Sequence, residues 1–306
     1  MVAQRLEAAN IFATYPSAKQ RLLLFDYDGT LTPIVENPAA AILSDEAIRS
    51  IQTLAADPRN AVWIVSGRNQ SFLEQLFGHL TEVGLVAEHG AFLRSPGSGS
   101  WEDLTAKVDM SWQEEVTKVF QSYTDLTPGS RIEKKRAAVV WHFRQASQEY
   151  AALQAAECKK DLESSIGKIS PLEFINGKCV LEGRLKFVNK GQIAQRLVEE
   201  IRAATGRPPD FALCIGDDVT DEDMFRALRD SDLPRSTVYT VTIGESQKRT
   251  DADWILTDPR EVIATIVMLN ESDGHDGGEG NGQDGNSKTN SKVLPVARSY
   301  LLGSGP

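Results

Sequence analysis

The chain has 306 residues, of which 41% are hydrophobic, and its formal net charge is −10 at pH 7. This length suits one large or two modest domains with a sizeable core. The acidic balance argues against nonspecific binding to nucleic acid or to an anionic membrane surface. It still permits a phosphorylated substrate that lysines and a metal hold locally.

The expected compartment follows from the cysteines and from the lack of targeting signals. Cys158, Cys179 and Cys214 are few, scattered and odd in number, and no C-x-x-C pair suggests zinc. Residues 1–20 contain no continuous apolar core, and no stretch approaches the roughly 20 apolar residues of a membrane span. We therefore expect a cytoplasmic protein with neither a membrane nor a nucleic-acid partner.

The first predicted strand, Leu22–Phe25, is an apolar run that ends in Asp-Tyr-Asp-Gly-Thr at residues 26–30. Such a run needs cover on both faces, as in a parallel α/β sheet, where the ligand crevice lies beyond the carboxyl ends of the strands. Asp26 and Asp28 repel each other unless a cation or a reaction needs them, and Mg²⁺ is a natural neutraliser. The alternative is an acidic turn that only caps a helix.

Two helices and two further strands are predicted next. Ser44 caps a helix, and a strand over Ala61–Val65 ends in Ser-Gly-Arg at residues 66–68. A second helix follows Asn69, and a short strand over Leu85–Ala87 ends in Glu-His-Gly. This β-α-β-α-β order predicts a parallel sheet with right-handed crossovers.

A different pattern begins after the turn or linker at residues 96–100. Helices are predicted over 111–126 and 148–166, and strands over 131–134, 137–143, 169–175 and 179–183, with a turn at Asn176-Gly177. We interpret this segment as an α+β cap domain over residues 94–186, inserted between core segments 1–93 and 187–270.

The β-α alternation resumes with a helix that starts at Lys190. A strand over Phe211–Ile215 then ends in Gly-Asp-Asp-Val-Thr-Asp at residues 216–221 and enters another helix. Strands over 238–243 and 254–256 and a helix over 259–269 complete the core. Residues 271–306 are expected to be mostly disordered, because they contain too few apolar residues to offset the entropy of ordering.

Four polar groups fall at strand ends or on the helix that resumes the core. Taken singly, each has an ordinary explanation: a helix cap for Ser66, a solvated surface position for Lys190 and dipole capping for the acids at 217–221. Their common edge and their order resemble the haloacid dehalogenase (HAD) superfamily, with its D-x-D-G-T strand end, Ser or Thr, lysine and acidic pair. The resemblance implies an α/β fold, with a Rossmann-like parallel-sheet core and an inserted α+β cap.

The resemblance also implies a chemistry of phosphoryl transfer. Asp26 is the candidate nucleophile, because a carboxylate can attack phosphorus and form an aspartyl phosphate. Asp28 suits a general acid that then acts as a general base, and superfamily dehalogenases lack this second acid. Thr30, Ser66 and Lys190 would hold the oxygens of the transferring phosphoryl group.

Mg²⁺ is the cofactor that this resemblance implies. Its expected ligands are the Asp26 carboxylate, the Asp28 backbone carbonyl and the Asp217 carboxylate. Asp218 and Asp221 are expected in the second shell, where they orient water ligands of the metal.

Within the superfamily, the closer resemblance is to trehalose-6-phosphate phosphatases. It is carried by D-Y-D-G-T-L-T-P-I at residues 26–34, V-S-G-R at 65–68, E-H-G at 88–90 and G-D-D-V-T-D-E-D-M-F at 216–225. The last run is specific, because sucrose-phosphate phosphatases and phosphomannomutases share the core without it. The inserted segment also matches the αββαββ cap of these enzymes.

This closer resemblance implies a site for the sugar. The expected substrate-binding residues are Arg68, Glu133, Lys135, Arg144, Asn176, Lys178 and Glu182. Mixed acids and bases supply both acceptors and donors for sugar hydroxyls. The alternative is that the cap residues are only solvated charges on its strands.

The resulting hypothesis is a Mg²⁺-dependent phosphatase that hydrolyses trehalose 6-phosphate to trehalose and phosphate through a phosphoaspartate. The alternatives are another sugar-phosphate phosphatase or a phosphomutase of the same superfamily, and a noncatalytic sugar-phosphate sensor. Fungal family members commonly carry this domain behind a synthase-like one, so the resemblance also implies a trehalose-synthase-type domain or subunit as a partner.

Overall fold

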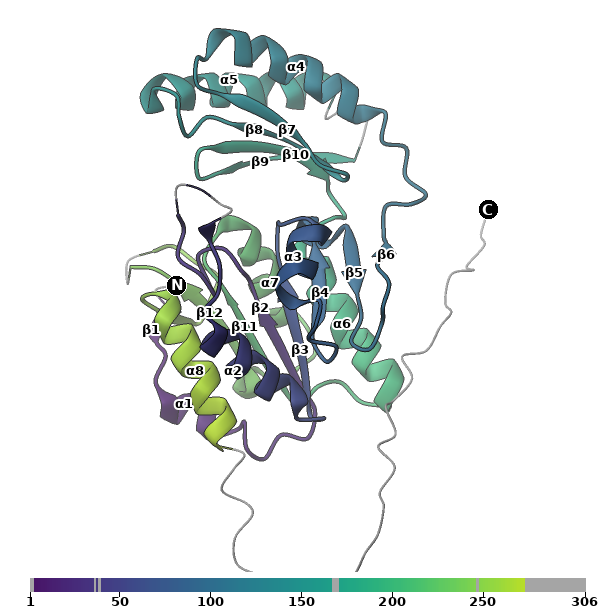
Figure 1. The fold of residues 1–306 in the computed structure, drawn as a ribbon, viewed down its shortest axis with the longest axis vertical. Helices are drawn as coiled ribbons and strands as arrows, with labels where there is room; N and C mark the ends of the chain where they lie inside the picture. The colour runs from purple at the N-terminus through teal and green to yellow at the C-terminus, as the bar shows by residue number, and fades with distance from the viewer. Residues whose placement is uncertain (1–2, 36, 38–39, 167–170, 246–247, 273–306) are drawn as a thin grey trace, which may run out of the picture.

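The computed structural model describes residues 3–35, 37, 40–166, 171–245 and 248–272. Two β-sheets dominate it, a large one with helices on both faces and a small one that lies beyond one edge of the large sheet (Figure 1). None of the described helices is both long enough and apolar enough to cross a membrane. The expected disordered tail lies almost entirely outside the described residues.

The large sheet has nine strands in the order β1-β13-β12-β11-β2-β3-β4-β5-β6. In this spatial order, neighbouring strands from β1 through β4 pair in parallel. The strands β5 and β6 then pair antiparallel at one edge of the sheet. The strands are β1 (Gln4–Arg5), β2 (Arg21–Phe25), β3 (Asn60–Val65), β4 (Gly84–Ala87), β5 (Phe92–Arg94), β6 (Glu102–Asp103), β11 (Phe211–Gly216), β12 (Val238–Ile243) and β13 (Trp254–Leu256).

Helices cover both faces of this sheet, which explains the continuous apolar run of β2. Leu23 and Phe25 pack in the hydrophobic core on the side of α2 and α8, whereas Leu22 and Leu24 pack against residues of α6 and α7 on the other side. The helices of this unit are α1 (Ala8–Phe12), α2 (Asp45–Ala56), α3 (Gln70–Phe77), α6 (Lys190–Thr205), α7 (Val219–Arg229) and α8 (Pro259–Ser272), with short 3₁₀ turns at Glu88–Gly90 and Arg235–Thr237.

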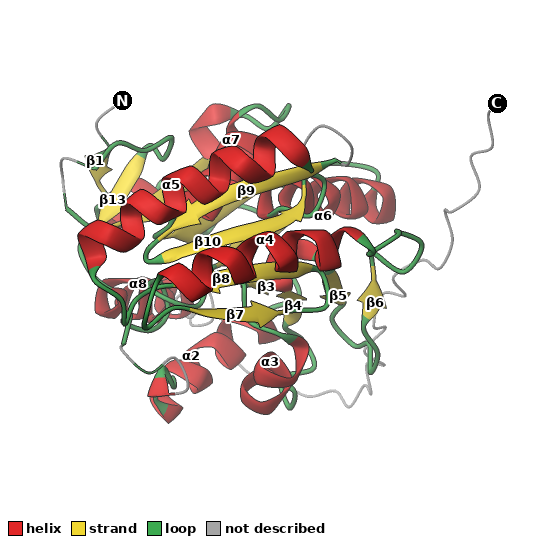
Figure 2. Cartoon of the chain, turned by 90° about the horizontal axis from the view of Figure 1, so that it is seen from above, coloured by secondary structure: helices red, strands yellow, loops and turns green. Residues whose placement is uncertain are grey.

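The small sheet is antiparallel, with the order β7-β8-β10-β9. Its strands are β7 (Arg131–Lys134), β8 (Ala138–His142), β9 (Leu172–Gly177) and β10 (Val180–Leu185), and its helices are α4 (Trp112–Leu126) and α5 (Gln148–Ser165). Both helices lie on the face of the small sheet that points away from the large sheet, as the view from above shows (Figure 2). The predicted fold class, an α/β core with an inserted α+β unit, is therefore confirmed.

Three local features differ from the sequence-based expectation. The N-terminal segment forms β1 and α1, for which no element was predicted, and β5 and β6 carry the large sheet to Asp103, past the boundary placed at residue 93. The expected turn at Asn176-Gly177 is wrong in register, because Gly177 pairs with Val180 and the turn is centred on Lys178 and Cys179. Cys179 adopts a left-handed φ of 63°. The division into domains otherwise stays a prediction.

Candidate active site

The predicted core residues meet at one edge of the large sheet. Asp26, Ser66 and Asp217 directly follow the neighbouring parallel strands β2, β3 and β11, and Lys190 is the first residue of α6. Because parallel strands end at the same edge, the topology brings these residues to the edge of the large sheet that faces the small sheet (Figure 1).

Lys190 is the centre of this group. Its Nζ lies 2.5 Å from Asp26 Oδ1 and 2.8 Å from Asp221 Oδ1, and all three residues are buried. Burial raises the pKa of Asp26 well above its usual range and Asp221 adds to this, while Lys190 opposes it. Although burial lowers the pKa of Lys190, the charges of Asp221 and Asp26 raise it overall. A fixed ammonium thus holds two carboxylates that otherwise repel each other.

Asp221 and Asp218 shape the start of α7. Asp221 Oδ2 accepts hydrogen bonds from the backbone N–H groups of Asp217 and Asp218, each at 2.9 Å. The Asp218 carboxylate accepts a hydrogen bond of 2.6 Å from the backbone of Val219. Gly216 leaves the space that Asp221 fills, since a β-carbon there would lie 2.2 Å from its Cγ. Asp221 therefore has both oxygens engaged by the protein itself.

Three carboxylates lie close enough together to hold a metal ion. One ligand atom from each of Asp26, Asp217 and Asp221 lies within 4.8 Å of the others. Asp217 Oδ1 is buried and has no hydrogen-bond partner among the described residues. Burial, with the charges of Asp221 and Asp218, raises the pKa of Asp217 to about 7. An excess of buried carboxylate oxygens fits a hard divalent cation such as Mg²⁺.

Gly29 makes room for this acid cluster. It adopts a left-handed φ of +84°, and a β-carbon there would lie 2.2 Å from Asp217 Oδ2. Any other residue would therefore be strained and would also collide with the carboxylate. Next to it, Thr30 is fully buried, and its hydroxyl has no hydrogen-bond partner within the described part of the chain.

Asp28 is paired with Arg68, which comes from the turn after β3. The guanidinium donates from Nε to Asp28 Oδ2 at 2.6 Å and from Nη2 to Oδ1 at 2.5 Å. Arg68 also lies over the Phe72 ring, 4.2 Å from its centroid. Ser66 is buried in the same turn, and its hydroxyl accepts a hydrogen bond of 3.1 Å from the Arg68 backbone. The structure thus brings Arg68, Ser66 and Asp28 together.

Some of the predicted sugar-binding residues lie on the core-facing side of the small sheet. Glu133 and Glu182 pair with the same residue, Val140, from opposite sides, so their side chains share one face. Glu182 is buried and its Oε2 lies 3.6 Å from His89 Nε2. Lys135 Nζ donates to the Gly67 carbonyl at 3.0 Å, which places it against the turn after β3.

The other predicted sugar-binding residues are not gathered with these. Asn176 pairs with the fully buried Leu181, so alternation places it on the face that the helices cover. Lys178 is exposed in the β9–β10 turn, and Arg144 is exposed and follows Phe143, whose backbone N–H donates to the Cys179 carbonyl of that turn. The neighbouring Gly177 lies near the Asp218 carboxylate, so this turn does reach the site edge.

Lys248 is a site residue that sequence reasoning missed. Its Nζ donates to the backbone carbonyl of Asp217, to Thr242 Oγ1 at 2.9 Å and to the Ile243 carbonyl at 3.3 Å. Its charge also counters the rise in the pKa of Asp217 that burial causes. A lysine in the polar run G-E-S-Q-K-R at residues 244–249 is typical of a solvated surface, and no sequence signal distinguishes it.

Comparison with known proteins identifies the family. Residues 24–260 match the family model described as Trehalose-phosphatase. The chain belongs to the trehalose-phosphatase family. A trehalose-phosphatase from Schizosaccharomyces pombe is 44% identical over 265 residues, which are 86% of this chain but 32% of that protein. The chain therefore spans about a third of that curated relative.

Solved structures of this family have the same fold. A trehalose-6-phosphate phosphatase from Aspergillus fumigatus aligns with a TM-score of 0.71 at 54% identity, covering 88% of this chain and 99% of that one. The C-terminal domain of the trehalose-6-phosphate phosphatase from C. albicans aligns with a TM-score of 0.82 at 43% identity and the same coverage. Haloacid dehalogenase-like hydrolases share the fold at far lower identity.

Proposed function

We propose that this chain hydrolyses trehalose 6-phosphate to trehalose and phosphate through a phosphoaspartate. The observation that carries the proposal is the buried cluster in which Lys190 holds Asp26 beside Asp217, at the edge where Asp28 also lies. The family to which the chain belongs supports the choice of substrate. The chain covers only part of its curated relatives, so their activity is carried over as part of this proposal.

Asp26 is the proposed nucleophile. Lys190 engages Oδ1, so we assign the attack on phosphorus to Oδ2. A bond forms between this oxygen and phosphorus while the bond between phosphorus and the sugar oxygen breaks. Lys190 and the hydroxyls of Thr30 and Ser66 then hold the transferring oxygens, which carry the negative charge.

Asp28 is the proposed acid and base. It donates a proton to the departing sugar oxygen and then removes one from the water that attacks the aspartyl phosphate. Both Asp28 oxygens accept hydrogen bonds from Arg68, so at least one of these bonds must open while Asp28 carries the proton. Contact between the substrate and Arg68 would open this hydrogen bond to Asp28.

Mg²⁺ fits the carboxylate oxygens of this edge. Asp26, Asp217 and the backbone carbonyl of Asp28 would hold it, while Asp221 serves Lys190 and the start of α7 and Asp218 stays in the outer shell. When bound, Mg²⁺ supplies positive charge to the phosphoryl oxygens. The protein's own part is to keep these carboxylates close together before the metal and the substrate arrive.

The small sheet is the proposed sugar-binding surface. Glu133, Lys135 and Glu182 line its core-facing side, and Arg68 approaches from the core. Lys178 and Arg144 would contribute from the β9–β10 turn and its neighbour. Asn176 would require a change of orientation, because its register places it on the opposite face.

Phosphate release from trehalose 6-phosphate, measured with Mg²⁺ and with excess chelator, tests the proposal. We expect turnover only with Mg²⁺, and calorimetric titration should show Mg²⁺ binding to the protein alone. Rapid turnover of other sugar phosphates would favour a broader phosphatase, and an isomeric sugar phosphate as product would favour a phosphomutase. Binding without any turnover would favour the sensor alternative.

A trehalose-synthase-type domain or subunit is the proposed partner. The curated relative from Schizosaccharomyces pombe is about three times as long as the part that this chain matches. A partner of this kind would supply the substrate next to the site. We also assign the protein to the cytoplasm, in keeping with three cysteines that form no disulfide.

A further inference from the structure

The turn that follows β4 has an unusual backbone. Glu88 and His89 both adopt left-handed conformations, with φ of 48° and 56°, and Gly90 follows with φ of 117°. Residues with a β-carbon rarely adopt this conformation, and two in succession persist only where the surroundings hold them in place. Such strain tends to occur at sites that serve a function, so the contacts of this turn are informative.

The backbone of the turn is bonded to the proposed phosphate-binding edge. Glu88 N–H donates to the Arg68 carbonyl at 2.9 Å, and His89 N–H donates to the Ser66 carbonyl at 2.9 Å. Two backbone hydrogen bonds therefore hold the turn against Ser66 and Arg68.

The two side chains reach in the other direction, into the small sheet. The buried Glu88 carboxylate accepts hydrogen bonds from the backbone N–H groups of Ala137 at 2.8 Å and Arg136 at 3.4 Å, just before β8. His89 Nε2 lies 3.6 Å from Glu182 Oε2 on the adjacent strand β10. One turn thus contacts strand β10 and the residues that lead into the neighbouring strand β8.

Gly67 also takes part in this junction between the turn after β4 and the small sheet. A β-carbon at Gly67 would lie 2.4 Å from His89 Nε2, so the imidazole occupies space that only glycine leaves open. The carbonyl of the same residue accepts the hydrogen bond from Lys135. Both Lys135 and Glu182 are proposed to bind the sugar, and both contact this junction.

We propose that Glu88 and His89 are positioning residues that fix the small sheet over the phosphate-binding edge and thereby set the affinity for the sugar. This rests on the proposed function. Neither residue needs to touch the phosphoryl group, because they act through Lys135, Glu182 and the start of β8. Their loss should therefore impair recognition of the sugar far more than phosphoryl transfer itself.

The test compares a sugar phosphate with a phosphate ester that lacks a sugar. His89→Asn removes the ring and keeps a residue that tolerates left-handed backbone, and Glu88→Gln removes the charge at nearly constant shape. We expect the KM for trehalose 6-phosphate to rise roughly tenfold in each, and kcat/KM for p-nitrophenyl phosphate to stay within about threefold. Equal losses on both substrates, or no loss on either, would overturn the proposal.

Gly67→Ala supplies a double-mutant cycle. Alone it should raise the KM for trehalose 6-phosphate, because the new methyl group displaces the imidazole. Combined with His89→Asn it should add little, since the ring is already gone, whereas additive effects would show that the two residues act independently. His79→Asn, at an exposed histidine of the same unit, is the matched control and should leave both substrates unaffected.

Hydrogen exchange gives a readout that does not depend on turnover. The amide of Ala137 should exchange faster in Glu88→Gln than in the native protein, while the amides of β2 keep their protection. Unchanged exchange at Ala137 would contradict the proposal. If the native protein releases no phosphate from trehalose 6-phosphate, the proposed function fails, whereas the exchange result still tests the junction.

Discussion

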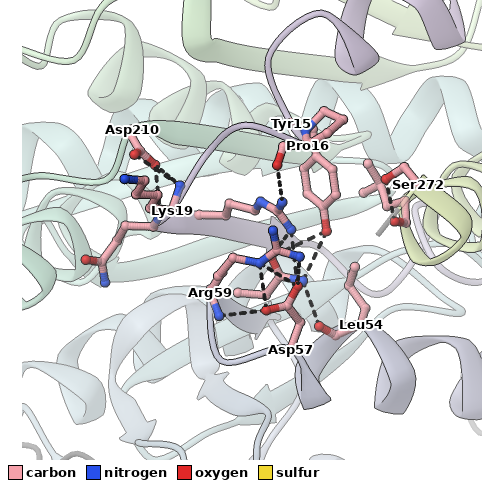
Figure 3. Close-up of polar contacts among 12 residues, drawn as sticks. Tyr15, Pro16, Lys19, Leu54, Asp57, Arg59, Asp210 and Ser272 are labelled. Atoms are coloured by element: carbon pink, nitrogen blue, oxygen red, sulfur yellow. Dashed lines mark hydrogen bonds and ion pairs between the residues drawn. The ribbon is translucent and has the colours of Figure 1, made fainter. Parts of the chain in front are cut away.

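The two ends of the central strand β2 carry buried charges that are arranged in opposite ways. Figure 3 shows Tyr15, Asp57 and Arg59 within the polar contacts at the amino end. Arg21 is fully buried there, and it donates to Asp57 and Asn60, both at 3.3 Å, and lies 3.7 Å from the centroid of the Tyr15 ring. Arg59 pairs with the same Asp57 at 2.7 Å. At the carboxyl end, three carboxylates lie close together, and Lys190 pairs with two of them.

We interpret this difference as one between a structural network and the proposed active site. At the amino end, two guanidinium groups share the Asp57 carboxylate, and Asn60 adds further hydrogen bonds to Tyr15 and to the Leu54 carbonyl. At the carboxyl end, negative charge is in excess, and buried acceptors of Asp217 and Thr30 have no partner in the described part of the chain. Close buried carboxylates that outnumber the nearby cations repel one another, so their retention fits a cation supplied from outside the protein.

The largest expected effect is at the carboxyl end. Asp26→Asn should lower the turnover of trehalose 6-phosphate by at least about 10⁴-fold, because it removes the proposed nucleophile and a proposed metal ligand together. In metal-free buffer the same variant should be no less stable than the native protein, because one of three repelling carboxylates is neutralised. Rapid-quench experiments should detect no phosphoenzyme. A normal phosphoenzyme burst would show that another residue is the nucleophile.

The next effect concerns the second acid of the same edge. Asp28→Asn should slow hydrolysis of the sugar phosphate by about 10² to 10⁴-fold, as expected for a lost general acid-base. The phosphorylation step should suffer less with p-nitrophenyl phosphate, whose leaving group needs little protonation. Dephosphorylation stays slow, so aspartyl phosphate should accumulate. Equal losses in phosphorylation for the two substrates would contradict the acid role, and absence of the burst would contradict the base role.

The carboxyl end was predictable from the sequence because its determinants are local. Apolar runs identify β2, β3 and β11, and parallel topology then brings together whatever polar residues follow them. Asp26, Asp217 and their neighbour Lys190 could therefore be named without coordinates, and the structure places them side by side.

Other features depend on pairings that no local pattern specifies. The two-residue strands β1 and β6 exist only because distant segments lie beside them. The face on which Asn176 lies depends on the turn register, because a one-residue shift moves every side chain of a strand to the other face. Arg21 and Lys248 resemble surface cations in the sequence, and only their nonlocal partners show otherwise.

The amino end should show the opposite response to substitution. Arg21→Met should lower the free energy of unfolding by about 2–4 kcal/mol, because Asp57 and Asn60 lose hydrogen bonds in a buried site. The kcat of the folded fraction should be unchanged. Urea unfolding measures the first quantity and phosphate release the second.

Arg59→Met is the matched control for this end. Arg59 pairs with the same Asp57, but its side chain is 37% exposed, so its loss should cost at most about 1 kcal/mol. Equal destabilisation by the two variants would mean that the burial of Arg21 does not make its loss more costly than the loss of Arg59. A loss of kcat in Arg21→Met would contradict our interpretation that the amino end of β2 serves stability and not activity.

The smallest expected effect is at Lys248, which holds the backbone of Asp217 from behind. Lys248→Met should raise the Mg²⁺ concentration for half-maximal activity by about three- to tenfold, at the lower end of the effects seen when groups that orient metal ligands are lost. The effect is small because two consequences oppose each other. Losing the hydrogen bond to the Asp217 carbonyl loosens a metal ligand, whereas losing a positive charge favours the cation.

Calorimetric titration of Mg²⁺ should show the same shift without substrate, and Lys160→Met, at an exposed lysine of α5, should show none. Tighter Mg²⁺ binding in Lys248→Met would mean that its charge outweighs its contact, and that Asp217 keeps its position without it.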